Sequence, residues 1–254
     1  MEGLKRSTFT ITYGDVAENH VGMQKIGDMA SKGFAPDDLQ KARKLFEKGG
    51  FNCITKNLNN ALPDDITADK ATVLVVKEGL RFFCDIDVLF KELEELNWDT
   101  KVKMYGRVCN KHARYNLCFG DENQEPDYEN GKGRVISFAD VDLLRLIREK
   151  LSMFLGEKGE NLMAEGNYYY DSNKCGIGFH GDAERKKVVA FRLGSPIPLH
   201  YQWYQNSKPI GKRVRLRLQH GDLYIMSEKA SGYDWKKKSI PTLRHAAGAK
   251  KFIK

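Results

Sequence analysis

The chain has 254 residues, 41% of them hydrophobic and 11% aromatic, a composition that is typical of globular proteins and excludes a disordered chain. It contains no apolar run near the roughly 20 residues that a membrane helix needs. Its first residues, MEGLKRSTFTITYGD, lack the apolar region of a secretory signal. We therefore expect a soluble, intracellular protein that makes no membrane contact and whose five scattered cysteines, none in a CxxC pair, stay reduced.

The net charge of +8 is unevenly distributed along the chain. Residues 180–254 contain 17 Lys and Arg against 5 Asp and Glu, a balance of +12. Residues 1–179 contain 25 against 29, a balance of −4. Basic residues concentrated in this way fit a polyanionic partner, although they also serve solubility.

The first 70 residues carry few clear signals, and we expect them to form an N-terminal extension of helix and loop. Within it, PDDLQKARKLFEK (36–48) predicts a helix, because proline and acids fill its first turn, lysine ends it and two glycines follow. From residue 71 the pattern sharpens. It predicts strands at 71–76 and 113–119, a helix at 85–96 and an amphipathic helix at 138–155.

The remainder consists of short apolar segments separated by turns. These segments are NYYY, GIGFH, VVAFRLG, LHYQWY, RVRLRLQ, DLYIM and KKFI. Strands that follow one another without intervening helices are typical of barrels and jelly rolls. The sequence therefore predicts an α+β protein in which residues 71–254 form one domain, with helices packed against a double-stranded β-helix (jelly roll) core.

Two His-Gly-Asp triplets stand out among the six histidines, at His180 to Asp182 and at His220 to Asp222. A facial triad of two histidines and one carboxylate holds Fe(II) and leaves positions open for co-substrate and O₂. In a jelly roll the second histidine comes from a late strand. The 63 residues from Asp182 to His245 accommodate several strands, whereas 23 residues from Asp222 do not. We assign the first triplet to metal and the second to a tight turn.

The stretch NYYYDSNKCGIGFHGDAE (167–184) resembles the fingerprint of the AlkB-like Fe(II)- and 2-oxoglutarate-dependent dioxygenases, an Asn-x-Tyr followed by His-x-Asp-x-acid. AFRLGS and HGDLYIM resemble later strands of that family. GRVCNKHARYNLCFGD, followed by PDY, resembles its nucleotide-recognition segment. The resemblance covers about residues 71–254. It implies an oxidoreductase that uses Fe(II), 2-oxoglutarate and O₂ to hydroxylate or oxidatively demethylate a nucleic-acid base, as in DNA repair.

The resemblance also implies roles for particular residues. His180, Asp182 and His245 would be the metal ligands and catalytic residues, Asn167 and Tyr169 would hydrogen-bond 2-oxoglutarate, and Glu184 would contact substrate. The chain departs from the family in two places: Lys238 stands where the family has its distal histidine, so we assign His245 instead, and no arginine follows His245 to bind the far carboxylate. Lys250 or Lys251 could supply that charge, and Arg215 or Arg217 is the alternative.

A base must be single-stranded or flipped out of a duplex to reach a buried metal, and it then needs aromatic and basic contacts. Candidates for stacking are Tyr115, Tyr201, Trp203 and Tyr204, and candidates for phosphate contacts are Lys111, Arg114, Lys212, Arg213 and Lys236 to Lys238. Two alternatives remain. One is an oxygenase that acts on a protein or a small molecule. The other is a non-catalytic nucleic-acid-binding relative.

Overall fold

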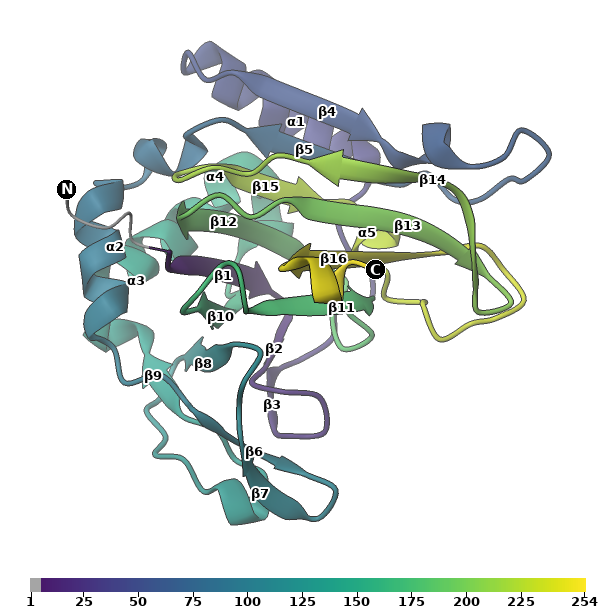
Figure 1. The fold of residues 1–254 in the computed structure, drawn as a ribbon. Coiled ribbons are helices and arrows are strands. Elements are labelled where there is room, and N and C mark those ends of the chain that lie inside the picture. Colours follow the sequence, from purple (N-terminus) through teal and green to yellow (C-terminus); the bar gives the residue numbers. More distant parts are fainter. Residues whose placement is uncertain (1–5) are drawn as a thin grey trace.

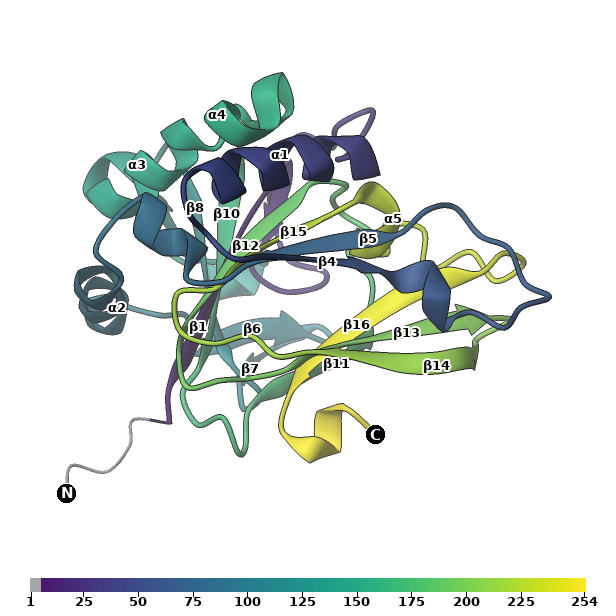
Figure 2. The same ribbon diagram turned by 90° about the horizontal axis from the view of Figure 1, so that it is seen from above.

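The computed structural model describes residues 6–254 as three stacked layers (Figures 1 and 2). Helices α1 (Pro36–Lys48), α3 (Asp142–Lys150) and α4 (Ser152–Leu155) cover one face of a large sheet, and a smaller sheet covers its other face (Figure 2). Helices α2 (Ile86–Glu95) and α5 (Glu228–Ser231) lie at the margins. Short 3-10 turns occur at Leu58–Ala61, Gly79–Phe82, Tyr128–Asn130, Phe138–Asp140, Gly156–Gly159 and Lys250–Phe252.

The large sheet has eight strands in the order β4-β5-β15-β12-β1-β10-β8-β9. Each neighbouring pair is antiparallel except β8 and β9. The strands are β1 (Thr8–Gly14), β4 (Cys53–Asn57), β5 (Thr72–Val76), β8 (Tyr115–Gly120), β9 (Val135–Ser137), β10 (Met163–Tyr169), β12 (Val188–Gly194) and β15 (Leu223–Met226).

The smaller sheet has four antiparallel strands in the order β11-β16-β13-β14. They are β11 (Gly176–His180), β13 (Leu199–Gln205), β14 (Lys208–Leu216) and β16 (Thr242–Gly248). Two hairpins stand apart from both sheets, β2 (Val16–Glu18) with β3 (Lys25–Gly27) and β6 (Lys101–Met104) with β7 (Arg107–Asn110). Helices on one face of mostly antiparallel sheets confirm the expected α+β class.

Strand β1 corrects the expectation of an N-terminal extension made of helix and loop. It lies near the middle of the large sheet, hydrogen-bonded to β10 on one side and to β12 on the other. Its sequence, TFTITYG, alternates polar and apolar residues, so Phe9, Ile11 and Tyr13 pack under the helices. The described residues before position 71 therefore share one core with the rest of the chain.

The other predicted elements have mixed outcomes. The helices at 36–48 and 85–96 are confirmed as α1 and α2, and the strand at 71–76 is confirmed as β5. The single helix at 138–155 is instead a 3-10 turn followed by α3 and α4. The final strand at KKFI is wrong. The backbone turns at Gly248, where φ is +112°, and residues 250–252 form a 3-10 turn.

The space between the two sheets has an apolar half and a polar half. A buried apolar cluster fills the apolar half, next to β5, β15 and β14. It includes Val75, Ala190, Trp203 and Leu243. Beneath β1 and β10 the side chains are polar instead, among them Thr10 and Thr12 on the face of β1 opposite the helices. The polar half is the cavity described below.

Two further observations bear on the expectations from composition. All five cysteines are unpaired. Among residues 6–254, the helices are too short or too polar for any of them to cross a lipid bilayer.

Replacing Ile11 by alanine tests the central place of β1. Ile11 is fully buried against the helix layer, so its truncation should lower the free energy of unfolding by about 2–5 kcal/mol. Ile54→Ala on edge strand β4 is the matched control, because Ile54 is 39% exposed, and it should cost less than about 1 kcal/mol. Urea titration followed by circular dichroism measures both. Equal effects would mean that β1 is not a core strand.

Candidate metal centre

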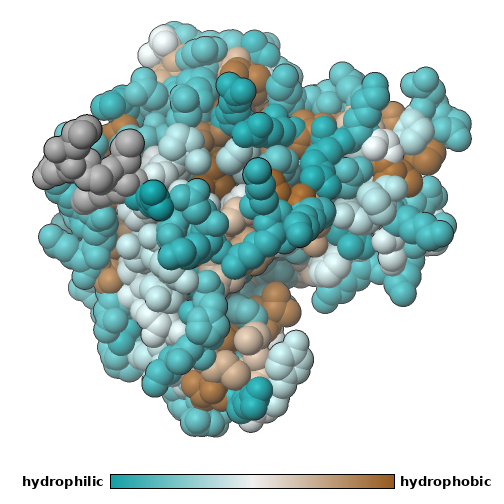
Figure 3. Space-filling model, viewed as in Figure 1, coloured by the Kyte–Doolittle hydropathy of each residue, from teal (hydrophilic) through white to brown (hydrophobic). Residues whose placement is uncertain are grey.

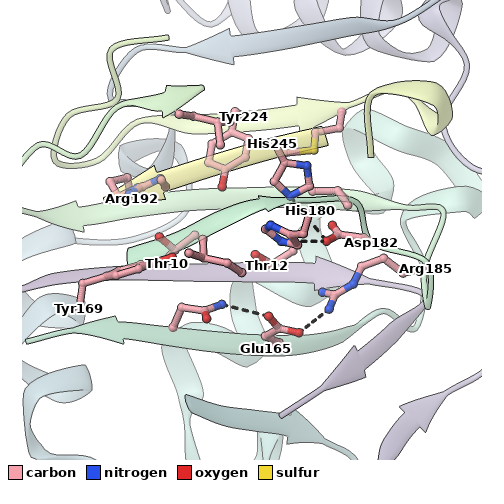
Figure 4. A pocket seen from close by; sticks show the side chains of 16 residues that line it. Thr10, Thr12, Glu165, Tyr169, His180, Asp182, Arg185, Arg192, Tyr224 and His245 are labelled. Carbon is pink, nitrogen blue, oxygen red and sulfur yellow. Dashed lines mark hydrogen bonds and ion pairs between the residues drawn. The ribbon is translucent and has the colours of Figure 1, made fainter. Parts of the chain in front are cut away.

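Three side chains from two distant parts of the sequence meet at one end of the cavity (Figure 4). His180 is the last residue of β11, Asp182 follows two residues later, and His245 lies in β16. The antiparallel pairing of β11 with β16 sets His180 directly opposite His245. One ligand atom from each of the three residues lies within 4.8 Å of the other two.

The carboxylate of Asp182 sits between the two imidazoles. Its Oδ1 atom is 3.6 Å from Nε2 of His180 and 3.6 Å from Nε2 of His245. Ligand atoms that each lie about 2.1 Å from one metal ion are roughly 3–4 Å apart, so these separations suit a shared ion. The donor set, two imidazoles and one carboxylate on one side, is that of a facial triad.

The hydrogen bond of His180 prepares Nε2 as a ligand. Nδ1 of His180 is 2.8 Å from the carbonyl oxygen of Gly178, and because a carbonyl can only accept, Nδ1 must carry the proton. Nε2 then keeps its lone pair and faces Asp182. Metal-binding histidines commonly have their second nitrogen fixed in this way.

Burial sets the charge of the triad in the metal-free protein. It lowers the pKa of His180 to about 4, helped by the charge of His245 and opposed by Asp182. Burial alone would raise the pKa of Asp182, but the charge of His245, together with that of Arg185, holds this pKa well below its usual range. A neutral imidazole and an ionised carboxylate are the forms that bind a metal.

The second triplet has a different environment. Asp222 is fully buried, accepts hydrogen bonds from the backbone N–H groups of Glu78 and Gln219, and pairs with Lys77. Nδ1 of His220 accepts a hydrogen bond from the N–H of Gly194 at 2.9 Å. These contacts hold a turn, as the sequence analysis expected for this triplet.

The cavity runs from the triad between the two sheets. Thr10, Thr12, Glu165, Asn167 and Tyr169 line it from β1 and β10, and Arg192 and Tyr224 line it from β12 and β15 (Figure 4). Asn167 and Tyr169, the two residues predicted to hydrogen-bond 2-oxoglutarate, therefore both line the cavity. The Asn167 amide is already engaged, because its Oδ1 accepts from Arg114 at 2.5 Å and from Asn116 at 2.9 Å, and its Nδ2 donates to Glu165.

Arg192 is the functional candidate that the sequence analysis missed. Arg192 is only 1% exposed, and its Nε and Nη1 atoms have no hydrogen-bond partner among residues 6–254. Tyr224 lines the same cavity, and burial raises its pKa to about 12, whereas the charge of Arg192 lowers that pKa. A buried guanidinium with free donors is costly unless an anion joins it. The signal in the sequence was an arginine inside the apolar run VVAFRLG.

The basic residues expected to bind the far carboxylate lie elsewhere. Lys250 and Lys251 are exposed on the C-terminal turn and do not line the cavity. Arg215 and Arg217 are exposed on and just after β14. In the large sheet β1 lies between β10 and β12. The neighbouring arginine on β12 therefore faces the cavity at the position opposite Thr10.

Glu184 lies in a buried ion-pair cluster next to the triad and outside the cavity lining. Its carboxylate is 2.9 Å from Arg185, which also pairs with Glu165. Burial raises the pKa of Glu184 to about 6, against the charge of Arg185. The structure therefore gives Glu184 an internal partner.

The two other residues predicted to contact substrate lie in different environments. Arg114 is half-exposed and holds Asn167 at the edge of the cavity. Tyr115 instead stacks on Tyr170 with ring centroids 4.8 Å apart and packs against the helix-side core. Lys111 is buried and donates to Asn19 and Asn116, so it is not available to a phosphate.

No protein-family model matches this sequence. The uncharacterized protein R156 of Acanthamoeba polyphaga mimivirus is 51% identical over 251 residues, which are 98% of this chain and 98% of the viral protein. The name of the viral protein states no activity, so the chemistry of the site carries the functional argument.

The titration of His180 tests this geometry. In the metal-free protein we expect a midpoint near pH 4, below the ordinary value of 6.5. Between these values the unfolded chain binds a proton that the folded chain does not, so this group makes the protein less stable as pH falls. Asp182→Asn should lower the midpoint further, because the carboxylate favours the imidazolium. Nitrogen-15 NMR of the histidine rings measures the midpoint. A midpoint near pH 6.5 that is the same in the wild type and in Asp182→Asn contradicts the geometry.

Proposed function

We propose that this chain, which belongs to the same protein family as the uncharacterized mimivirus protein, is an Fe(II)- and 2-oxoglutarate-dependent dioxygenase of the AlkB-like type. Its substrate would be a nucleic-acid base, which it would hydroxylate or oxidatively demethylate. The observation that carries the proposal is the His180–Asp182–His245 cluster at the end of a polar cavity. With 2-oxoglutarate and O₂, Fe(II) in such a site supplies the oxidising power to attack a C–H bond.

The order of the strands supports a double-stranded β-helix. From β10 onward the chain alternates between the sheets except at the hairpin of β13 and β14: β10, β12 and β15 lie in the large one, and β11, β13, β14 and β16 in the small one. Such crossing between two facing sheets is typical of jelly rolls. In this reading β1 takes the place that a strand after His245 would have between β10 and β12.

The charges in the cavity fit a dicarboxylate co-substrate. The triad lies at one end, and Arg192 and Tyr169 lie toward the other (Figure 4). A co-substrate that reaches the metal with one carboxylate carries a second negative charge away from it. Arg192, with two free donor atoms, is the buried cation suited to that charge, and Tyr169 and Thr10 add hydroxyl groups beside it.

The hairpin of β6 and β7 is our candidate for the nucleotide-recognition segment. It projects from the body of the protein (Figure 1). Tyr105 at its tip is 94% exposed, and Lys101, Lys103 and Arg107 flank it. An exposed aromatic ring among basic residues suits the stacking of an unpaired base beside a phosphate backbone.

The two His-Gly-Asp triplets offer a matched test. Asp182→Ala should weaken Fe(II) or Mn(II) binding by at least about 100-fold and abolish succinate release, because it removes a metal ligand without touching the apolar core. His220→Ala should keep metal and turnover, because it removes only a hydrogen bond in a turn. Isothermal titration with Mn(II), and succinate assays with methylated oligonucleotides, measure both.

The outcomes of this test separate the alternatives. Normal turnover by Asp182→Ala overturns the assignment of the triad. Loss of metal in His220→Ala would mean that the second triplet, and not the first, binds the metal. Turnover that requires a protein or a small molecule identifies a different substrate class. Tight oligonucleotide binding without metal or turnover identifies a non-catalytic binding protein.

Arg192→Met tests the co-substrate end of the cavity. Removing one partner of a buried charge pair typically costs 2–5 kcal/mol, so 2-oxoglutarate should bind at least about 30-fold more weakly. Mn(II) affinity should not change, because Arg192 is not a ligand. The metal-free variant should unfold at a higher temperature than the wild type, since an unpaired buried charge is gone.

The ligand itself supplies the control for this variant. 2-Oxobutanoate keeps the group that binds metal and lacks the second carboxylate. The wild-type protein should prefer 2-oxoglutarate over it strongly, and Arg192→Met should lose that preference. If both proteins discriminate equally, another residue binds the far carboxylate.

A further inference from the structure

The outer face of the four-stranded sheet carries a row of alternating arginines and aromatic rings. Cζ of Arg244 lies 4.0 Å from the ring centre of Tyr204 and 5.0 Å from that of Trp235. The rings of Tyr204 and Phe179 are 6.2 Å apart, and Cζ of Arg213 lies 5.0 Å from the ring of Phe179. We call these five residues the Arg–aromatic strip. It joins β11, β16, β13 and β14 with the loop before β16.

The strip has no acidic counterpart in its sheet. The four strands of this sheet contain five Lys and Arg and no Asp or Glu. Neither Arg213 nor Arg244 forms an ion pair with a described residue, and Nε of Arg244 has no hydrogen-bond partner among residues 6–254. Figure 3 shows the corresponding face of the molecule as mainly hydrophilic. Positive charge without an acidic partner inside the protein favours an anionic ligand from outside.

The guanidinium groups are held in place before any ligand arrives. Arg244 lies between two rings, and Nη1 of Arg213 donates to the carbonyl oxygen of Ile253 at 2.6 Å. Phe179, Tyr204 and Trp235 remain half-exposed. Fixed guanidinium groups suit phosphates, and ring faces beside them suit planar bases, so the strip matches a chain that carries both.

The strip ends at the candidate metal centre. Phe179 precedes His180, and Arg244 precedes His245, each on the opposite face of the strand from its neighbour. Trp235 packs on Gly181, where an added Cβ would lie 2.7 Å from Cβ of Trp235. A ligand along the strip would thus pass beside the residues that form the triad.

We propose that the Arg–aromatic strip binds single-stranded nucleic acid, stacking bases on Tyr204 and Phe179 and pairing phosphates with Arg213 and Arg244. The strand held there is the part that flanks a base in the cavity. The identity of the partner rests on the proposed function, but binding to the strip requires neither metal nor co-substrate.

Binding by the full-length, metal-free protein tests the strip. Fluorescence anisotropy with a labelled oligothymidine of about 16 nucleotides gives the affinity. Tyr204→Leu and Arg213→Gln should each weaken it about tenfold. Arg213→Gln should also reduce the slope of affinity against salt concentration by about 0.7. Arg145→Gln on α3 is the matched control, because it removes the same charge from an exposed arginine outside this sheet and should leave affinity within about twofold of the wild type.

Two competitor ligands separate stacking from charge. An abasic oligonucleotide has the same phosphates without bases and should bind about tenfold more weakly to the wild type, a preference that Tyr204→Leu should lose. Equal binding of the abasic strand, of polyglutamate or of anionic vesicles overturns the proposal in favour of a general polyanion surface. Wild-type affinity in both strip variants also overturns it.

Failure of the strip and failure of the proposed function give different results. Repeating the measurement with Asp182→Ala should give wild-type oligonucleotide affinity, even if no turnover is found for the wild type. The converse result is that the wild type turns over a methylated oligonucleotide while Tyr204→Leu and Arg213→Gln bind it with unchanged affinity. That result refutes binding by the strip and supports the oxygenase activity.

Discussion

The pairing of β11 with β16 is the constraint on which the candidate site depends. It sets His180 opposite His245, and residues directly opposite in an antiparallel pair have Cα atoms about 5 Å apart. Asp182, just beyond the end of β11, then places its carboxylate between the two imidazoles. A slip of one residue would turn one imidazole to the outer face and separate the ligands. Gly181 permits this approach, because any larger residue there would meet the backbone of Gly232 and the side chain of Trp235.

The same alternation that brings the histidines inward sends their neighbours outward. His245 faces the cavity while Arg244 faces the solvent side, and His180 and Phe179 divide in the same way. The adjacent strands β11 and β16 therefore contribute side chains of different chemistry to the two faces of the sheet. The inner face carries the His180–Asp182–His245 cluster, and the outer face carries the Arg–aromatic strip. Under our two proposals, a strand bound to the outer face would lie one residue away from the triad.

Two buried arginines show how the cavity is divided by charge. Arg185 is paired with Glu165 and Glu184, and Arg185 and Glu165 form part of the cavity wall that also contains the triad. Arg192 has no carboxylate partner among the described residues and keeps two donor atoms free. A protein that is only marginally stable seldom keeps such a charge without use, since its burial lowers the stability of the fold. The uncompensated arginine therefore indicates where an anionic ligand belongs.

The sequence by itself determined the elements whose signals are local and three side chains that the fold brings together. Helix α1 follows from its capping residues, and the choice of His180, Asp182 and His245 follows from the length of chain needed for several strands. The role of Arg192 could not be predicted, because an arginine in a strand faces whichever side the pairing dictates. That pairing is with Thr10 on β1, and Thr10 lies far from Arg192 in the sequence. Only the tertiary structure decides such contacts, since periodicity shows which residues share a face but not what that face meets.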